Sequence, residues 1–174
     1  MRDAISYQRA MELHPAIRTE VIDIITHLEM FSFPENVAIR IVQGLRTIDV
    51  QNKLYAQGRT APGKIVTNAK GGSSFHNYGL AIDFAMLYDG KLSWQIGDDF
   101  DHDNTADWDE VVKGFTDKGY EWGGSWKSLK DYPHLQKSFG LTWAQCLDSY
   151  NKGKFIAGTQ YITISQPPVQ STAV

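Results

Sequence analysis

The stretch SFHNYGLAID, Ser74 to Asp83, decides how this chain of 174 residues is interpreted. Its first half has the composition of a loop, whereas the mainly apolar run from Gly79 to Leu87 predicts a strand that contains Asp83. His76 and Asp83 are then separated by six residues across the entry to that strand. Imidazole and carboxylate are both good zinc ligands. A carboxylate inside an apolar strand is costly unless it is paired or bound to a metal, which favours a ligand or ion-pair role for Asp83.

A second informative segment lies downstream, where WGGSW, Trp122 to Trp126, is followed by DYPH, Asp131 to His134. His134 is a candidate third ligand, and three protein ligands leave the fourth position of a tetrahedral zinc open for water, as in catalytic sites. Asp131, three residues before it, is suitably placed to accept a proton from that water. The two segments together contain the parts of a catalytic zinc site.

The rest of the chain predicts alternating helices and strands around these segments. The alternation of Val37, Ile39 and Ile41 indicates a half-buried strand that ends near Arg46. Residues 57–74 have the composition of a long loop, and such loops are often functional. The other expected elements are helices over residues 15–30, 50–56, 108–118 and 142–150, a strand over residues 92–96, and a frayed tail after about Gly158 with a short strand at 161–164.

Composition limits the class of protein. Apolar residues make up 42% of the chain and charged residues 21%, which is typical of one compact globular domain. The net charge of −3 and the lack of a basic, aromatic run argue against nucleic acid as a partner. Cys146 is the only cysteine, so no disulfide forms within the chain, and we expect it to be buried in a helix. Without an apolar leader or membrane span in the sequence, we expect a soluble product made in the cytoplasm with no signal peptide.

The pattern Ser-x-His-x-x-Gly-x-Ala-x-Asp, with a later Asp-x-x-His, resembles a family of zinc peptidases. This family shares one fold among D-alanyl-D-alanine carboxypeptidases, vancomycin-resistance D,D-dipeptidases and the hedgehog signalling domain. Within it, the chain looks most like the L-alanyl-D-glutamate endopeptidases of phage endolysins and some Bacillus autolysins. The similarity covers roughly residues 13–136 and includes Gly44 to Arg46 and Tyr55 to Thr60.

The resemblance implies an α+β fold in which a small antiparallel sheet carries the zinc site between flanking helices. It implies that His76, Asp83 and His134 hold zinc and that Asp131 is the general base and then acid. It also implies that Arg46 stabilises the oxyanion and that Ser74 lies near the substrate. Trp122 and Trp126 either line the cleft or pack in the core, and we expect Trp126 to contact substrate. The catalytic domain would span residues 1–157, with a partly disordered tail over residues 158–174.

The implied reaction is hydrolysis of the peptidoglycan stem peptide between L-alanine and D-glutamate. An Asp at position 131, where D,D-cleaving relatives usually have Glu, favours this branch. Two alternatives remain at this stage: a D-alanyl-D-alanine carboxypeptidase or dipeptidase, and a zinc-containing binding module without catalysis. The protein would act on the cell wall as a monomer, without inserting into the membrane, and a phage-encoded version would be released through a holin.

Acidic residues between the two zinc segments suggest a second metal. Acids occupy positions 1, 3, 5, 9 and 12 of an EF-hand calcium loop that starts at Asp99, and position 6, normally Gly, is Asn104. A solvated acidic loop is an equally good interpretation. The candidate calcium residues are Asp99, Asp101, Asp103, Thr105, Asp107 and Glu110.

Overall fold

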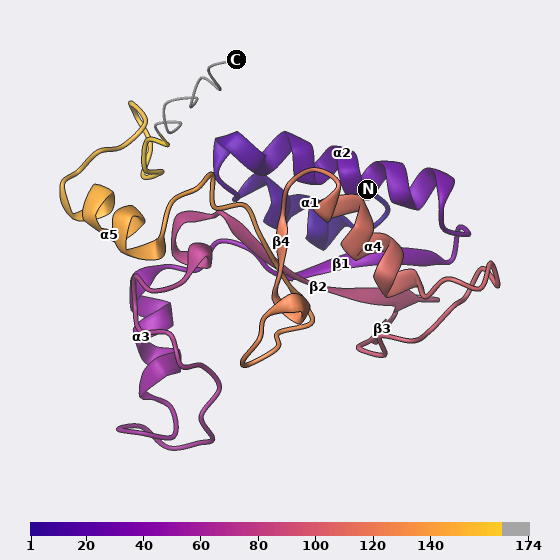
Figure 1. Cartoon of the computed structure of the whole chain (residues 1–174), viewed down its shortest axis with the longest axis horizontal. Coiled ribbons are helices and arrows are strands. Elements are labelled where there is room, and N and C mark those ends of the chain that lie inside the picture. The colour runs from indigo at the N-terminus through magenta and orange to yellow at the C-terminus, as the bar shows by residue number, and fades with distance from the viewer. Residues whose placement is uncertain (165–174) are drawn as a thin grey trace, which may run out of the picture.

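The computed structural model describes residues 1–164, which form helices packed on one small sheet (Figure 1). The helices are α1 (Ala4–Met11), α2 (Pro15–Phe31), α3 (Ile48–Ala56), α4 (Asp107–Thr116) and α5 (Trp143–Asn151), with short 3₁₀ helices η1 (Phe75–Tyr78) and η2 (Gly123–Ser125). The strands are β1 (Val37–Gln43), β2 (Ala81–Tyr88), β3 (Lys91–Ser93), β4 (Glu121–Trp122) and β5 (His134–Gln136). The predicted α+β class with a small antiparallel sheet is confirmed.

The sheet is built around β2, which pairs with β1, β3 and β5, while β4 extends the sheet beyond β5. All of these pairings are antiparallel. Seven of the eight β2 residues are buried and Asp83 is the exception, so this strand has its polar position where β1 and β5 meet it. In the register, Asp83 lies opposite His134 on β5 and opposite Gln43 on β1. Strand pairing therefore brings two of the predicted ligands together.

Helices α1, α2 and α4 gather on one side of the sheet (Figure 1). Ile17, Val21 and Ile25 of α2 are fully buried in the core. Trp108 of α4 packs on Phe84 of β2 with ring centroids 4.4 Å apart. Each fully buried aliphatic side chain contributes roughly 1.5–3 kcal/mol relative to exposure, so this layer holds the strands rigidly.

The helix predicted over residues 15–30 is confirmed as α2, with Pro15 in its first turn. His14 caps it by accepting a hydrogen bond from the Ala16 amide, in agreement with a capping role. Helices α3, α4 and α5 also lie where the sequence predicts them, Thr142 caps α5, and Cys146 is buried within α5.

Two elements differ from the sequence expectation. Helix α1 was not predicted, because its buried face includes Ser6, which bonds to the β1 backbone, rather than a run of apolar residues. The returning strand predicted to reach Ile96 is wrong in length, since β3 ends at Ser93. There the Ser93 hydroxyl accepts a hydrogen bond from the Gln95 amide and donates one to Asp98, which turns the chain out of the sheet.

The end of the described chain packs against the domain. Ile162 is buried, bridges to Phe155, and its carbonyl lies 2.8 Å from His14 Nε2. The segment from Gly158 to Ile164, expected as part of a frayed tail, thus includes a docked residue. Residues 165–174, the remainder of the predicted tail, lie outside the described residues. Among residues 1–164, none of the helices is both long and apolar enough to cross a membrane.

Candidate metal centre

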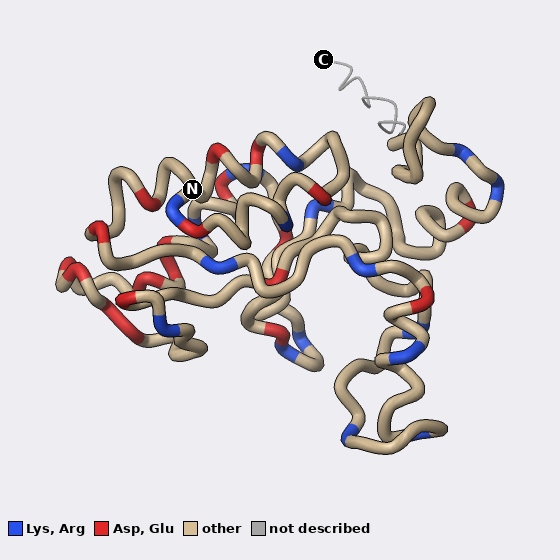
Figure 2. Tube along the Cα trace, turned by 180° about the vertical axis from the view of Figure 1, so that it is seen from behind, with Lys and Arg blue, Asp and Glu red and all other residues tan. Residues whose placement is uncertain are grey.

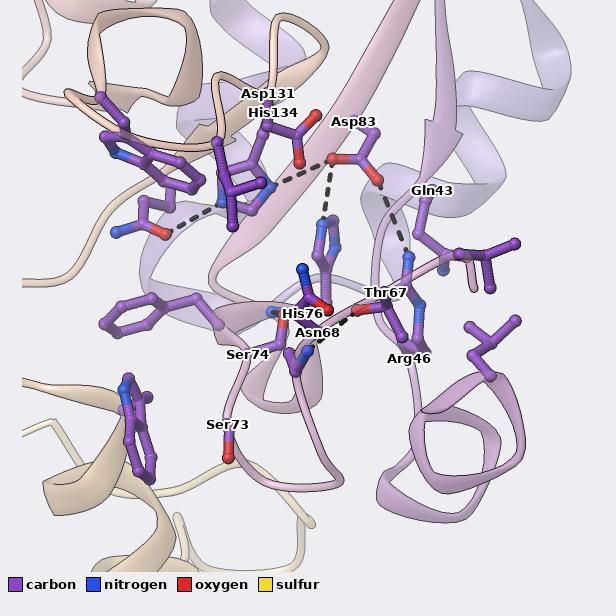
Figure 3. Close-up of a pocket in the computed structure, with 18 of the residues that line it drawn as sticks. Gln43, Arg46, Thr67, Asn68, Ser73, Ser74, His76, Asp83, Asp131 and His134 are labelled. Atoms are coloured by element: carbon purple, nitrogen blue, oxygen red, sulfur yellow. Dashed lines mark hydrogen bonds and ion pairs between the residues drawn. The ribbon is translucent and has the colours of Figure 1, made fainter. Parts of the chain in front are cut away.

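His76, Asp83 and His134 converge from three elements, η1, β2 and β5 (Figure 3). His76 Nε2 and His134 Nδ1 each lie 3.1 Å from Asp83 Oδ1. Ser74 caps η1, and the turn from η1 into β2 is made by Gly79 at φ +68°. A side chain at Gly79 would also meet the His14 amide nitrogen at 2.8 Å, so this tight turn requires glycine.

The outer hydrogen bonds fix which nitrogen of each imidazole faces the centre. His76 Nδ1 lies 2.8 Å from the Gly44 carbonyl, which can only accept, so this nitrogen carries the proton. His134 Nε2 lies 2.9 Å from Gln136 Oε1, and Gln136 in turn donates to the Glu121 carboxylate. Both imidazoles therefore direct a lone pair at Asp83, an arrangement typical of metal-ligating histidines.

This arrangement fits a cation of the size of zinc. Three lone pairs that meet without a proton repel one another, so the centre needs either an added proton or a metal. Tetrahedral zinc with bonds of about 2.0–2.1 Å separates its ligand atoms by about 3.3 Å. The 3.1 Å separations of Asp83 Oδ1 from each nitrogen lie close to that value. The set of two imidazoles and a carboxylate also matches the chemistry of catalytic zinc sites.

Without a metal, the same geometry shifts the protonation of the centre. Burial works against the charged form of Asp83, but His76 and the hydrogen bonds with both imidazoles hold the pKa of this carboxyl well below its usual range. Burial likewise opposes charge on His134, yet Asp83 raises the pKa of its imidazole. The centre is thus built to hold positive charge beside Asp83.

Arg46 was predicted near the end of a strand, but β1 ends at Gln43, and Arg46 instead faces the centre from the segment between β1 and α3. Its Nη2 is 3.7 Å from Asp83 Oδ2, and its Nη1 donates to Gln51. The backbone of Arg46 is held by hydrogen bonds to His76 and Asn77. Burial lowers the pKa of the guanidinium, which Asp83 and Asp131 oppose, and its Nε has no partner among residues 1–164. The buried guanidinium of Arg46 can therefore donate hydrogen bonds to an anionic group in the cleft.

Asp131 turns its carboxylate toward Asp83 (Figure 3). Burial and the charge of Asp83 raise its pKa, against the influence of His134, His76 and Arg46. The Asp131 amide donates to the Gly123 carbonyl at 3.1 Å. A Cβ on Gly123 would meet the Asp131 carbonyl at 2.4 Å, so the loop reaches this position only because residue 123 has no side chain.

A cleft of about 890 Å³ opens over the centre. Ser74 and Trp126 both line it, and the Trp126 ring lies 5.2 Å from that of His134. Trp122 instead packs against the core, and its indole donates to the Tyr132 carbonyl. The other lining residues include Val66, Thr67, Asn68 and Ala69, together with Leu129, Lys130 and Asp131.

The residues that support His134, Arg46 and Asp131 were not predicted. Gln136 and Glu121 position His134, Gln51 positions Arg46, and Gly123 admits Asp131. The alternation of His134, Leu135 and Gln136 along one strand was the available signal for Gln136, because residues two apart share a face. The other contacts join residues in neighbouring segments of the chain, at spacings that fit neither a helix nor a strand.

The acidic loop lies apart from this centre, between β3 and α4. Ligand oxygens of Asp99, Asp101 and Asp107 lie within 4.8 Å of one another, as do those of Asp101, Asp103 and Glu110. The structure thus brings together the five acidic members of the predicted calcium loop.

Comparison with known proteins agrees with this geometry. A family model described as D-alanyl-D-alanine carboxypeptidase matches residues 67–137, which include the three candidate ligands and Asp131. The peptidoglycan L-alanyl-D-glutamate endopeptidase CwlK of Bacillus subtilis strain 168 is 43% identical over 126 residues, 72% of this chain and 73% of that protein. The crystal structure of the Serratia marcescens L-Ala D-Glu endopeptidase ChiX matches with a TM-score of 0.52 and 26% identity, and covers 78% of this chain and 88% of that one. These similarities confirm the fold that the sequence resemblance implied.

Proposed function

Since this chain belongs to the metallopeptidase family that contains the L-alanyl-D-glutamate endopeptidase of Bacillus subtilis, we propose that it is a peptidoglycan hydrolase that cuts the stem peptide between L-alanine and D-glutamate. The convergence of His76, Asp83 and His134 beneath an open cleft is the observation that carries this proposal. In this proposal, residues 1–157 contain the catalytic machinery.

His76, Asp83 and His134 would hold one zinc ion, as their donor atoms and tautomers suit it. When bound, zinc supplies Lewis acidity that polarises the scissile carbonyl and lowers the pKa of water. The surrounding protein keeps both imidazoles oriented through Gly44 and Gln136. Such outer contacts typically contribute 10–100-fold to metal affinity or activity.

Asp131 would take the proton from the attacking water and deliver it to the leaving nitrogen. Its raised pKa suits a group that must both accept and release a proton. Arg46 would donate hydrogen bonds to the oxygen that becomes negative in the tetrahedral intermediate, and its fixed backbone keeps these donors preorganised. Trp126 and Ser74 would position the peptide along the cleft.

The D,D-carboxypeptidase alternative uses the same centre, and the matching family model carries that description. The two named endopeptidases favour internal cleavage over removal of a terminal residue. The non-catalytic alternative is disfavoured because Asp131 and Arg46 accompany the ligands. Two predictions from the resemblance accompany this proposal. A phage-encoded protein would be released through a holin, and the protein would act as a monomer.

Mass spectrometry of the fragments released from purified peptidoglycan by the zinc-loaded protein tests the proposal. We expect new L-alanine carboxyl termini and free D-glutamate amino termini. Release of terminal D-alanine would transfer the protein to the D,D branch. If no fragments appear while zinc is bound, the chain is a binding module.

A further inference from the structure

The loop between β3 and α4 concentrates negative charge at one end of the molecule, opposite α3 and α5 (Figure 2). Within residues 98–110 there are seven acidic residues and only His102 as a basic one. No Lys or Arg side chain forms an ion pair with any of them in the described structure, residues 1–164. The peptidase proposal gives this loop no role.

The carboxylates of this loop converge instead of spreading into solvent. Asp101 belongs to both groups of close oxygens, one with Asp99 and Asp107 and the other with Asp103 and Glu110. The loop therefore forms one cluster of five carboxylates, and Glu110 joins it from the first turn of α4. Repulsion among so many like charges is destabilising unless a cation offsets it.

Buried oxygens without partners give independent evidence of a ligand. Asp107 is fully buried, and its Oδ2 has no hydrogen-bond partner among residues 1–164. The Tyr88 hydroxyl nearby partly offsets the effect of burial on the pKa of Asp107, but it does not reach hydrogen-bond geometry. Asp99 Oδ1 and Glu110 Oε2 are buried and unpartnered in the same region. A buried polar atom without a partner typically costs about 1–3 kcal/mol, more for a charged group, so three in one cluster require an explanation.

We propose that this cluster is a calcium site formed by Asp99, Asp101, Asp103, Asp107 and Glu110. The ligands are all oxygens, which suits a hard cation, and five carboxylates exceed what magnesium usually takes from a protein. Thr105 contributes its backbone carbonyl, the usual donor at position 7 of such a loop. The site is separate from the metal centre, and its occupancy does not depend on the peptidase proposal.

The backbone already has the conformation that such a loop needs. Asn104 takes φ +74°, in the left-handed region normally occupied by glycine at position 6. Its amide donates to Asp99 Oδ2 at 3.1 Å, which closes the loop on its first ligand. Phe100 stacks on Tyr88 of β2 at a centroid distance of 3.6 Å and anchors the loop to the sheet. Bound calcium would therefore tie β2 to the first turn of α4.

Calorimetric titration of calcium chloride into the full-length protein tests this site. The protein is first stripped of metals and reloaded with one equivalent of zinc, so that the metal centre does not compete. We expect one calcium per chain with a Kd between about 10⁻⁵ and 10⁻³ M, a range typical of isolated sites of this kind. Magnesium chloride should bind at least about ten times more weakly, because it resists losing its water shell.

Matched variants locate the binding. Asp101→Asn, which removes charge from the residue shared by both groups, should weaken calcium binding by at least about tenfold. Asp117→Asn, on the exposed end of the same helix, should leave the affinity within about twofold of the parent. Terbium luminescence excited through the adjacent Trp108 gives a second readout on the unmodified protein. The proposal is overturned if calcium and terbium show no saturable binding up to about 10 mM. It is also overturned if Asp101→Asn binds as tightly as the parent, or if Asp117→Asn loses as much affinity.

Discussion

The two carboxylate-rich regions of this molecule differ in how their charges are balanced. At the metal centre, one partly buried carboxylate, Asp83, is surrounded by two imidazoles and a guanidinium. In the loop before α4, five carboxylates face one another without such partners in the described chain. In the first region, imidazole and guanidinium groups of the protein surround the carboxylate, whereas the site proposed in the second region would take its counter-charge from a cation in solution.

The two regions should therefore support different properties of the protein. The metal centre should support catalysis, and the acidic loop should support stability. Because hydrogen bonds already hold His76 and His134, removal of zinc should stop the reaction while the fold persists. Because no Lys or Arg side chain of residues 1–164 pairs with the acidic loop, removal of calcium from the proposed site should loosen the loop while the catalytic residues remain in place. The following substitutions test this division, and the largest expected effect comes first.

His76→Ala should remove both zinc and activity. Loss of one of three ligands leaves an incomplete site, and we expect the lytic rate to fall by at least about 10⁴-fold. The measurements are zinc per chain by elemental analysis and the rate of peptidoglycan solubilisation. His27→Ala, at an exposed position of α2, is the matched control and should keep one zinc and full activity. Retention of zinc by His76→Ala would remove this residue from the ligand set.

Asp131→Asn should separate chemistry from metal binding. The amide keeps the shape of the side chain but cannot accept the proton of water, so kcat should fall by about 10²–10⁴-fold. Zinc content and the thermal midpoint should stay at the parent values. A variant with parent-like activity would show that Asp131 is not the general base and would favour a different proton acceptor.

Gln136→Leu tests the hydrogen bond that orients His134 at the metal centre. Leucine cannot accept the His134 Nε2 proton, so the imidazole loses its fixed orientation, and zinc affinity should fall by about 10–100-fold. Competition with a chromogenic chelator measures the change. Ser138→Ala removes a different contact of Glu121 and serves as the control. Equal zinc affinity in Gln136→Leu and the parent would mean that the hydrogen bond from His134 to Gln136 does not support zinc binding.

Asp107→Asn should have the smallest effect of the four substitutions. The direction of its effect on stability should depend on whether calcium is present. Burial raises the pKa of Asp107, so its charge is unfavourable in the calcium-free fold. The amide oxygen can still accept from Phe100, while neutralisation should stabilise the calcium-free protein by about 1 kcal/mol. In calcium, the same substitution should reduce the rise in thermal midpoint that the parent shows. Destabilisation of the variant in calcium-free buffer would argue that the cluster is balanced without a cation.

How far the sequence predicts this molecule depends on how local each signal is. The helix predicted over residues 15–30 is α2, in which Ile17, Val21 and Ile25 recur at helical spacing, and the helix predicted over residues 142–150 is α5, which Thr142 caps. The pairing of Asp83 with His134 joins residues 51 positions apart, and it was anticipated only from the residue types of the two segments and from the family resemblance. Long-range contacts of this kind leave no periodic pattern in a single sequence.

The supporting residues were missed for a different reason. Gln51 accepts a hydrogen bond from Arg46 and Glu121 accepts one from Gln136, and neither pair has the spacing of a motif that a single sequence would reveal. The acidic loop behaved differently, because all its members lie within one short segment. Their spacing was visible directly, although the burial of Asp107 was not.

The most direct test of the division between the two regions is a crystal structure of the protein with both metals, measured above and below the zinc absorption edge. We predict one zinc-specific anomalous peak between His76, Asp83 and His134, and a separate calcium peak within the loop from Asp99 to Glu110. Zinc density away from the three predicted ligands, or zinc within the acidic loop, would contradict this account.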